Sequence, residues 1–542
     1  MTNSGDAAVS ALAPGSPALV AGSTATAALA SGPSPGTPVT LAGHSSQTFT
    51  WALTATGAGT LQLSVQASGA DANDGSARSA AATSGSVLVG ETKLVAADPF
   101  QDGTAFSFLL SFSGQIWLGP SAGGTGAVRM NADGSGAQAV PWQLEHNAGA
   151  KNTAYQGIPA HTIGFKGCAA NSAQCGPDNE SGRGLFFNGV IGGSEWLGLA
   201  GAHVNAGTDF ARFVYLTNPG FPTTAGGDTD FAYVDLSSSV SSSATSLTAA
   251  AAYHDRLYLG FQDGGGSSLK ALTAMPALPG STPSGNLLDM GASNMPGVGG
   301  GLRFDSMAVF GPATNDALYL ANASGLTRST SATPTQCQVL ILILLCPDWT
   351  DATPSAAAYS NKTSLASAKA SDLEPADRAI PSMVSFGGRL FAARNTTTGP
   401  QLWSCNPARG GDAAQCDPGD WSLVAPNTSG DTRLTQFNDA SNAAVTLLAA
   451  TPQHLFVGFN NASRGIVVYR TGNAAAAAAA DFTGREGCAA TGSGCPGFGG
   501  DGLGRGLTRI YDGKGLTFGG ADFLYLAAGT GTSPVRVYRA AP

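Results

Sequence analysis

The sequence predicts a nearly all-β fold with at least two domains, and three observations support this. The chain has 542 residues, which exceeds the size that one hydrophobic core usually serves. Only 11% of the residues are charged, whereas 75 are glycine. This composition favours short strands joined by many turns over salt-bridged helices. Apolar and polar residues alternate in short runs along the chain, which is the period of half-buried strands.

The first group of alternating runs predicts a small β-sandwich over residues 1–90. The stretch SGPSPGTPVTLAGHSSQTFTWALTATGAGTLQLSVQASGADANDGSARS resembles the immunoglobulin-like repeats of large surface proteins of gliding soil bacteria. In that family a strand precedes a TN-x-G segment, which stands here directly after Met1. The resemblance therefore implies a sandwich that lacks its first strand, in a piece of a longer surface protein.

A sequence pattern of four short predicted strands recurs from residue 106 onward. It is clearest at residues 382–386, 389–393, 401–404 and 421–424. Four short strands per repeat are typical of a propeller blade, and seven copies of the first two strands can be followed along the chain. Residues 91–542 are therefore expected to form a seven-bladed β-propeller.

The last copy of the pattern has no fourth strand before the sequence ends. A ring of sheets leaves no exposed edge only if its last blade is completed. Residues 92–96 have strand composition and precede the first blade, so they are expected to supply this strand. The predicted fold class is thus all-β: an immunoglobulin-like β-sandwich followed by a seven-bladed β-propeller closed by residues 92–96.

Eight cysteines fall into four close pairs, which are Cys168 with Cys175, Cys337 with Cys346, Cys405 with Cys416, and Cys488 with Cys495. Their spacings vary, and none is the two-residue spacing of zinc knuckles, so local disulfides are favoured over a metal site. Disulfides indicate an oxidising compartment and predict an extracellular or outer cell-surface location. No cofactor is predicted. Calcium stays an open alternative, because oxygen ligands from separate loops leave no sequence signature.

The charge of the chain excludes two classes of partner. A formal net charge of -9 provides no basic stripe for phosphates, so nucleic acid is not an expected partner. The longest run of large aliphatic side chains covers only residues 339–345, whereas a spanning helix needs about 20 apolar residues. The protein is therefore not expected to be integral to a membrane.

Charged residues recur just before the innermost strands of several predicted blades, at the expected mouth of the central channel. They are Arg303, Asp305, Arg433, Asp439, Arg509 and Asp512. Charges are scarce in this chain, so their recurrence at one position makes them candidate binding residues. The alternative interpretation is that they are surface residues that pair with one another and contribute little.

An aliphatic run between Cys337 and Cys346 is the second candidate site. If it forms one extended strand, alternate side chains point to opposite faces. Burial is then expected for Val339, Ile341, Ile343 and Leu345. The other face would be an exposed contact patch of Leu340, Leu342 and Leu344, which would favour self-association or partner binding.

The function classes that remain are binding, hydrolysis and assembly. No nucleophile elbow or P-loop is present, so a binding function is favoured over a catalytic one. The leading hypothesis is a cell-surface binding or adhesion module with ligand contacts on propeller-face loops. Its partner would be a surface polysaccharide or a protein, and the resemblance implies a link to gliding motility. The alternatives are a secreted polysaccharide-active enzyme with converging acids, and a subunit of an extracellular filament with exchanged strands.

Overall fold

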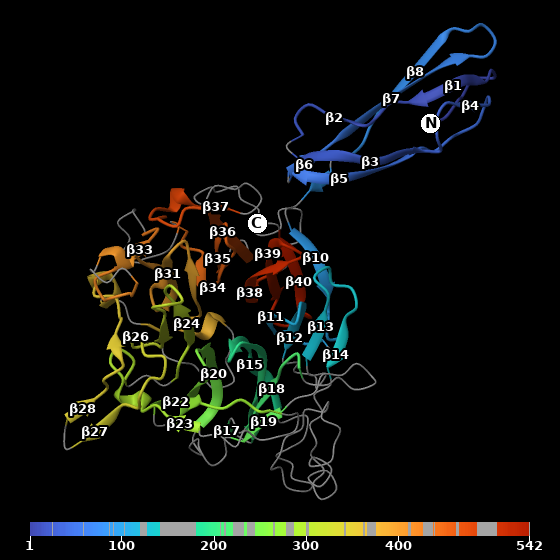
Figure 1. Ribbon diagram of the computed structural model, residues 1–542. Helices are drawn as coiled ribbons and strands as arrows, with labels where there is room; N and C mark the ends of the chain where they lie inside the picture. The colour runs from blue at the N-terminus through green and yellow to red at the C-terminus, as the bar shows by residue number, and fades with distance from the viewer. Residues whose placement is uncertain are drawn as a thin grey trace, which may run out of the picture. The chain divides into compact units, whose positions relative to one another are not determined.

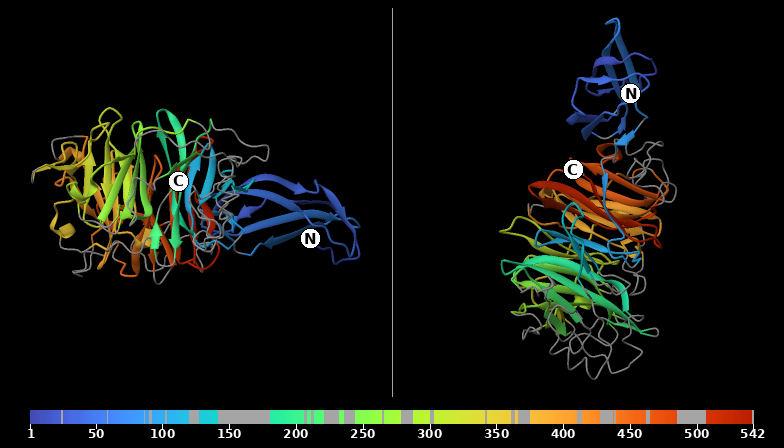
Figure 2. Two further views of the ribbon diagram at one scale, coloured as in Figure 1. Left: turned by 90° about the horizontal axis from the view of Figure 1, so that it is seen from below. Right: turned by 90° about the vertical axis from the view of Figure 1, so that its right-hand side faces the viewer.

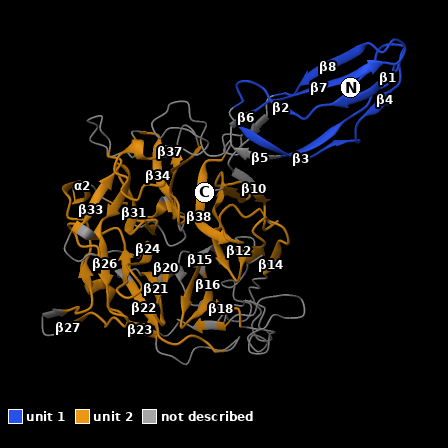
Figure 3. Ribbon diagram, turned by 45° about the horizontal axis from the view of Figure 1, so that its top comes forward, with its two compact units in different colours: residues 1–92, 485–488, 498–504 blue, residues 93–484, 489–497, 505–542 orange. Residues whose placement is uncertain are grey.

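The computed structural model separates into two units, which Figure 3 colours differently. It describes residues 1–23, 25–57, 59–85, 87–89, 92–101, 103–119, 127–140, 180–205, 208–210, 213–220, 232–235, 244–263, 266–277, 287–299, 303–340, 343–360, 364–365, 375–409, 414–426, 437, 439–461, 465–484 and 507–540. This part of the chain is nearly all β, which confirms the predicted fold class. None of its helices is long and apolar enough to cross a membrane.

The first unit, Met1–Thr92, consists of short strands around a small core. Its strands are β1 (Val9–Pro14), β2 (Ala18–Leu19), β3 (Thr26–Ser34), β4 (Val39–Leu41), β5 (Thr50–Gly57), β6 (Gly59–Leu61), β7 (Leu63–Asp71), β8 (Ala77–Thr83) and β9 (Val87–Val89). One sheet has the order β2-β7-β1-β4 with β8 beside β7, and β3 pairs with β5 and β6 with β9. The buried core consists of Leu12, Leu41 and Ala67. Its immunoglobulin-like character stays a prediction.

The second unit contains the blades, and each blade is a separate sheet of short strands (Figure 1). Blade 1 comprises, in pairing order, β11 (Phe108–Phe112), β12 (Gln115–Gly119), β13 (Ala127–Met130) and β14 (Gln138–Val140). Blade 2 comprises β15 (Glu180–Ile191), β16 (Ser194–Asn205), β18 (Phe213–Thr217) and β19 (Ala232–Asp235), with β17 (Thr208–Phe210) also paired to β16. Blade 3 comprises β20 (Ala244–Tyr253), β21 (Arg256–Asp263), β22 (Gly266–Leu272) and β23 (Leu287–Asp289).

The remaining blades repeat this antiparallel pattern. Blade 4 comprises β24 (Ser306–Phe310), β25 (Ala317–Ala321), β26 (Leu326–Ser329) and β29 (Thr350–Asp351). Blade 5 comprises β30 (Met383–Phe386), β31 (Arg389–Thr396), β32 (Gly399–Cys405) and β33 (Trp421–Val424). Blade 6 comprises β34 (Asn442–Ala450), β35 (Leu455–Asn461), β36 (Gly465–Thr471) and β37 (Thr483–Gly484). Blade 7 comprises β38 (Arg509–Phe518), β39 (Ala521–Gly529), β40 (Arg536–Ala540) and β10 (Thr92–Ala97).

The first strands of the blades form a closed ring. They contact one another in the cyclic order β11, β15, β20, β24, β30, β34, β38 and back to β11, and Figure 2 shows the same sheets from two further sides. Strand β10 lies outside β40 and completes blade 7, where a closing strand was expected from residues 92–96. Just beyond β10, the amide of Asp98 donates to the carbonyl of Val535 at 3.1 Å. The described strands therefore form a seven-bladed β-propeller.

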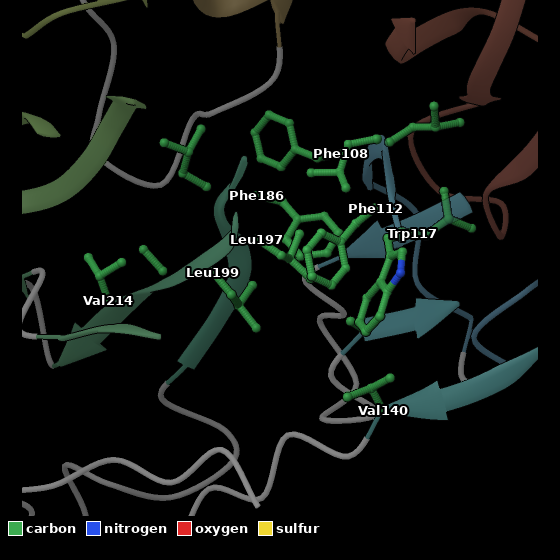
Figure 4. Close-up of a cluster of buried hydrophobic side chains, with 14 of the residues drawn as sticks. Phe108, Phe112, Trp117, Val140, Phe186, Leu197, Leu199 and Val214 are labelled. Carbon is green, nitrogen blue, oxygen red and sulfur yellow. The ribbon is translucent and has the colours of Figure 1, made fainter. Parts of the chain in front are cut away.

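The second strand of a blade is buried on both faces because a neighbouring blade covers each of them. In β12, Ile116, Trp117 and Leu118 are all almost fully buried. The Trp117 ring lies 5.8 Å from that of Phe112 and 6.4 Å from that of Phe186 in blade 2 (Figure 4). Such strands therefore consist of consecutive apolar residues in the sequence and do not alternate between apolar and polar residues.

Two of the expected disulfides are present in the described part of the chain. Cys337 is bonded to Cys346, and Cys405 to Cys416. The pair Cys168 and Cys175 and the pair Cys488 and Cys495 lie outside the described residues. Each observed bond closes a short loop at the edge of a blade.

The aliphatic run inside the first of these loops is a hairpin, which corrects the expected burial pattern. Strands β27 (Gln338–Leu340) and β28 (Ile343–Leu345) are antiparallel, and Val339 lies opposite Leu344. Leu345 was expected to be buried but is 45% exposed. The chain folds back on itself and does not run as one strand. Ile341 and Leu342 lie outside the described residues, and the contact patch of Leu340, Leu342 and Leu344 stays a prediction.

Candidate ligand-binding site

A cavity of about 210 Å³ lies at the centre of the ring. Every first strand contributes to its wall, with Leu110, Asn188, Ala250, Met307, Met383, Leu448 and Lys514 as one example from each blade in order. Because residues from all seven strands surround it, this cavity is the central channel of the propeller. It is the place where side chains from distant parts of the sequence meet.

Bulges at one repeated position direct polar side chains into the channel. In β20 the pairing register shifts between Leu247 and Ala249, and in β34 it shifts between Val445 and Leu447. A bulge adds one residue to a strand and changes the direction of the side chains around it. The inserted residues, Thr248 and Thr446, both line the cavity. In β38 the corresponding inserted residue, Tyr511, packs in the hydrophobic core, and Asp512 directly after it lines the cavity.

Arg303 and Asp305 form a buried ion pair at the wall of the channel. The Nε atom of Arg303 lies 2.8 Å from Oδ1 of Asp305, and both side chains are at most 1% exposed. The other carboxylate oxygen of Asp305 accepts the backbone N–H groups of Ala379 at 3.0 Å and Ile380 at 3.2 Å. Asp305 therefore holds the segment before blade 5 against blade 4. This pair is not the exposed surface pair that the alternative interpretation assumed.

Asp512 connects blade 7 to blade 1. Its Oδ2 atom accepts the backbone N–H of Leu109 at 2.9 Å, and its Oδ1 atom lies 3.4 Å from the ammonium of Lys514. Asn395 in blade 5 plays the same part, because its side-chain oxygen accepts the N–H of Val445 in blade 6 at 2.9 Å. Side-chain oxygens thus join successive blades through backbone N–H groups. Asp305 and Asp512 belong to this set.

Arg378 also enters the channel, and the sequence analysis missed it. It directly follows the 3-10 helix η4 (Pro375–Asp377) and lines the cavity, where it is only 7% exposed. Its Nη1 atom donates to the carbonyl oxygen of Asp305 at 3.4 Å, and its guanidinium carbon lies 5.6 Å from the ring centre of Phe108. Its Nη2 atom is buried and has no hydrogen-bond partner.

The electrostatics of Arg378 follow from this burial. Desolvation, reinforced by the neighbouring charge of Arg303, lowers the pKa of Arg378 to about 10. At neutral pH the guanidinium therefore stays protonated. A protonated group with an unpaired N–H in a buried place attracts an acceptor, and an anionic acceptor most strongly.

The structure does not bring all the predicted binding residues together. Asp439 accepts from the side-chain amide of Asn461 at 3.0 Å and from the N–H of Ser441 at 2.9 Å, and it does not line the cavity. Arg509 is the exposed first residue of β38 and is also absent from the cavity wall. Arg433 lies outside the described residues. Within the described ranges, no group of three or more side chains is arranged to hold a metal ion.

Comparison with known proteins gives no family for this chain. No protein-family model matches it, and no curated protein matches its sequence. Among solved structures, similarity is found to the PQQ-bound aldose sugar dehydrogenase of Streptomyces coelicolor, with 11% identity over 66% of this chain and 95% of that chain and a TM-score of 0.30. The phage phi92 endosialidase shows 9% identity over 84% and 70%, with a TM-score of 0.37. These values are too low to transfer an activity or a ligand.

Proposed function

We propose that this chain is an exported binding module that takes one group of a surface polysaccharide into the central channel of its propeller. The proposal rests on the acidic residues in the channel wall, whose carboxylates are already engaged by other groups of the protein. Asp305 is occupied by Arg303 and two backbone N–H groups, and Asp512 by Leu109 and Lys514. A glycosidase needs one acid to protonate the leaving group and a second carboxylate free to act on the sugar. The described wall therefore favours binding over hydrolysis.

The size and chemistry of the channel support a sugar-sized ligand. At about 210 Å³ it is smaller than pockets for drug-sized ligands, which span roughly 300–1,000 Å³. Hydroxyl and amide groups of Thr248, Ser306, Ser382 and Asn188 contribute to its wall. Such groups match the hydroxyls of a single pyranose ring or of a terminal substituent. The two observed disulfides support export. Where the polysaccharide is attached to a cell, its binding in the channel also attaches the protein to that cell.

Affinity electrophoresis of the full chain tests this proposal. Native gels are cast with polygalacturonate, dextran sulfate or neutral dextran, and the same mixtures are assayed for new reducing ends. We expect retarded migration in at least one gel without release of reducing ends. A time-dependent increase in reducing ends would show an enzyme and overturn the proposal. Unretarded migration in all three gels would overturn it as well.

A matched pair of variants in blade 5 locates the contact. Ser382 lines the channel, whereas Ser385 is exposed on β30. Ser382→Leu should reduce the retardation by filling part of the channel, and Ser385→Leu should leave it unchanged. Equal retardation of both variants and the wild type would place the polysaccharide outside the channel.

A further inference from the structure

We propose that the group bound in the channel is an oxyanion, the carboxylate or sulfate of an acidic saccharide, and that Arg378 binds it. The saccharide part of this inference rests on the proposed function, whereas the anion part rests on the channel itself. Arg378 is more than nine-tenths buried, it lines the cavity, and its Nη2 atom has no partner. An anion that enters the channel supplies the missing acceptor.

Two other buried arginines of the propeller, Arg394 and Arg303, show what a structural role requires. A further buried arginine, Arg328, also has one nitrogen without a partner, but its guanidinium is paired with the carboxylate of Asp417 at 2.8 Å. Arg394 donates to the Ser364 hydroxyl at 2.9 Å, to the Tyr359 carbonyl at 2.9 Å and to the Gln401 side-chain oxygen at 3.2 Å. Arg303 has the carboxylate of Asp305 and the carbonyl of Asp377. Arg378 has one carbonyl at 3.4 Å. A buried cation with so few partners is unfavourable unless a ligand completes its shell.

The acidic groups around Arg378 do not complete that shell. The carboxylate of Asp305 is bonded to Arg303, Ala379 and Ile380, and only its backbone carbonyl reaches Arg378. Asp512 faces Leu109 and Lys514. Asp377 attracts Arg378 electrostatically, but it is partly exposed and does not line the cavity.

Lys514 adds a second cation to the same wall. Its side chain is 48% exposed, so the ammonium is in contact with solvent and can meet a ligand that enters. A compact ammonium and a buried guanidinium that line the same channel favour an anionic group over a neutral one. Because Arg378 has one free nitrogen, a single anion oxygen satisfies it. Carboxylate and sulfate both provide such an oxygen.

Thermal unfolding of the full chain with small probes tests the inference. The probes are galacturonate, inorganic sulfate and galactose, each titrated at constant ionic strength with sodium chloride. A ligand that binds only the folded state raises the melting temperature with its concentration. We expect the temperature to rise with galacturonate, with sulfate or with both, and not with galactose. A response to galacturonate alone assigns a carboxylate, and a response to sulfate alone assigns a sulfate group.

Variants connect the response to Arg378. Arg378→Met should abolish the shift, and Arg378→Lys should retain part of it because the charge remains. Arg536→Met is the matched control, since it removes the same charge from an exposed position on β40, and it should leave the shift unchanged. If Arg378→Met does not fold, Lys514→Met is tested in its place. Its affinity for the anion should be several-fold weaker than that of the wild type.

The outcomes separate this inference from the proposed function. No shift with either anion, together with retained retardation by polysaccharide, would overturn the anion and leave the binding module standing. A shift that is the same in the wild type, Arg378→Met and Lys514→Met would also overturn it. Loss of polysaccharide retardation with a retained, Arg378-dependent anion shift would instead overturn the saccharide and keep the anion site.

Discussion

Blade 5 and the central channel each bury an arginine side chain, and they do so in different ways. In blade 5, Arg394 has three hydrogen-bond acceptors and stacks 3.6 Å from the ring centre of Tyr359. In the channel, Arg378 has one distant carbonyl and a free Nη2 atom. Burial of a cation alone thus does not indicate a binding site. The indicator is a buried cation whose set of partners is incomplete.

The largest expected effect on stability is at Arg303. Among the described contacts of Arg303, Arg378 and Arg394, only Arg303 forms an ion pair with a carboxylate. Arg303→Met leaves the buried charge of Asp305 without its cation. We expect the propeller to lose about 3–5 kcal/mol of unfolding free energy. Urea unfolding followed by tryptophan fluorescence measures this. A loss below about 1 kcal/mol would show that the two backbone N–H groups suffice for Asp305.

The next effect is expected at Arg394. Arg394→Met removes three hydrogen bonds and leaves the carbonyl of Tyr359 and the side-chain oxygen of Gln401 without this donor. A loss of about 2–3 kcal/mol is expected in the same unfolding measurement. Arg394→Lys should recover only part of it, because one ammonium cannot reproduce the fork of a guanidinium. Full recovery by lysine would contradict the assigned geometry.

The disulfide in the same blade allows the covalent and polar contributions to blade 5 to be compared. Cys405 and Cys416 are separated by 11 positions, and both are buried. The double variant Cys405→Ala and Cys416→Ala should lower the unfolding free energy by about 2–3 kcal/mol, because the unfolded chain regains the freedom of that loop. The matching double variant at Cys337 and Cys346 is the control for a more peripheral loop. An unchanged midpoint in the first variant would show that packing alone holds blade 5.

The smallest effect on stability is expected at Arg378. Arg378→Met keeps an apolar stem near Phe108 and removes a buried, incompletely paired charge. Without ligand, the unfolding free energy should change by less than about 1 kcal/mol. The same urea series measures it beside Arg394→Met. If the two variants lose equal stability, Arg378 is a structural residue and the comparison fails.

The sequence predicts the propeller well because its signal is local and repeated. The run Leu455, Phe456 and Val457 and its counterparts in other blades are recognisable without any knowledge of their neighbours. The hairpin at residues 338–345 was missed because no glycine, proline or asparagine interrupts its aliphatic run.

The candidate site is predictable only in part. Asp305 and Asp512 were found from their positions near inner strands, but their partners Ala379 and Leu109 belong to other parts of the chain. No spacing in the sequence relates an acceptor to a donor in another blade. Arg378 lies in a connecting segment. It is a candidate only because its guanidinium lacks hydrogen-bond partners in the folded protein. A sequence cannot show which buried group has no partner.

The most direct test of the anion site is to locate an anion in crystals of the full chain. Crystals of the wild type and of Arg378→Met are soaked separately in selenate and in bromoacetate, and anomalous scattering shows where selenium or bromine is bound. The account predicts a peak in the channel of the wild type, with an anion oxygen about 2.7–3.2 Å from Nη2 of Arg378, and no such peak in the variant. Peaks confined to the outer surface, or a channel peak that persists in Arg378→Met, would contradict it.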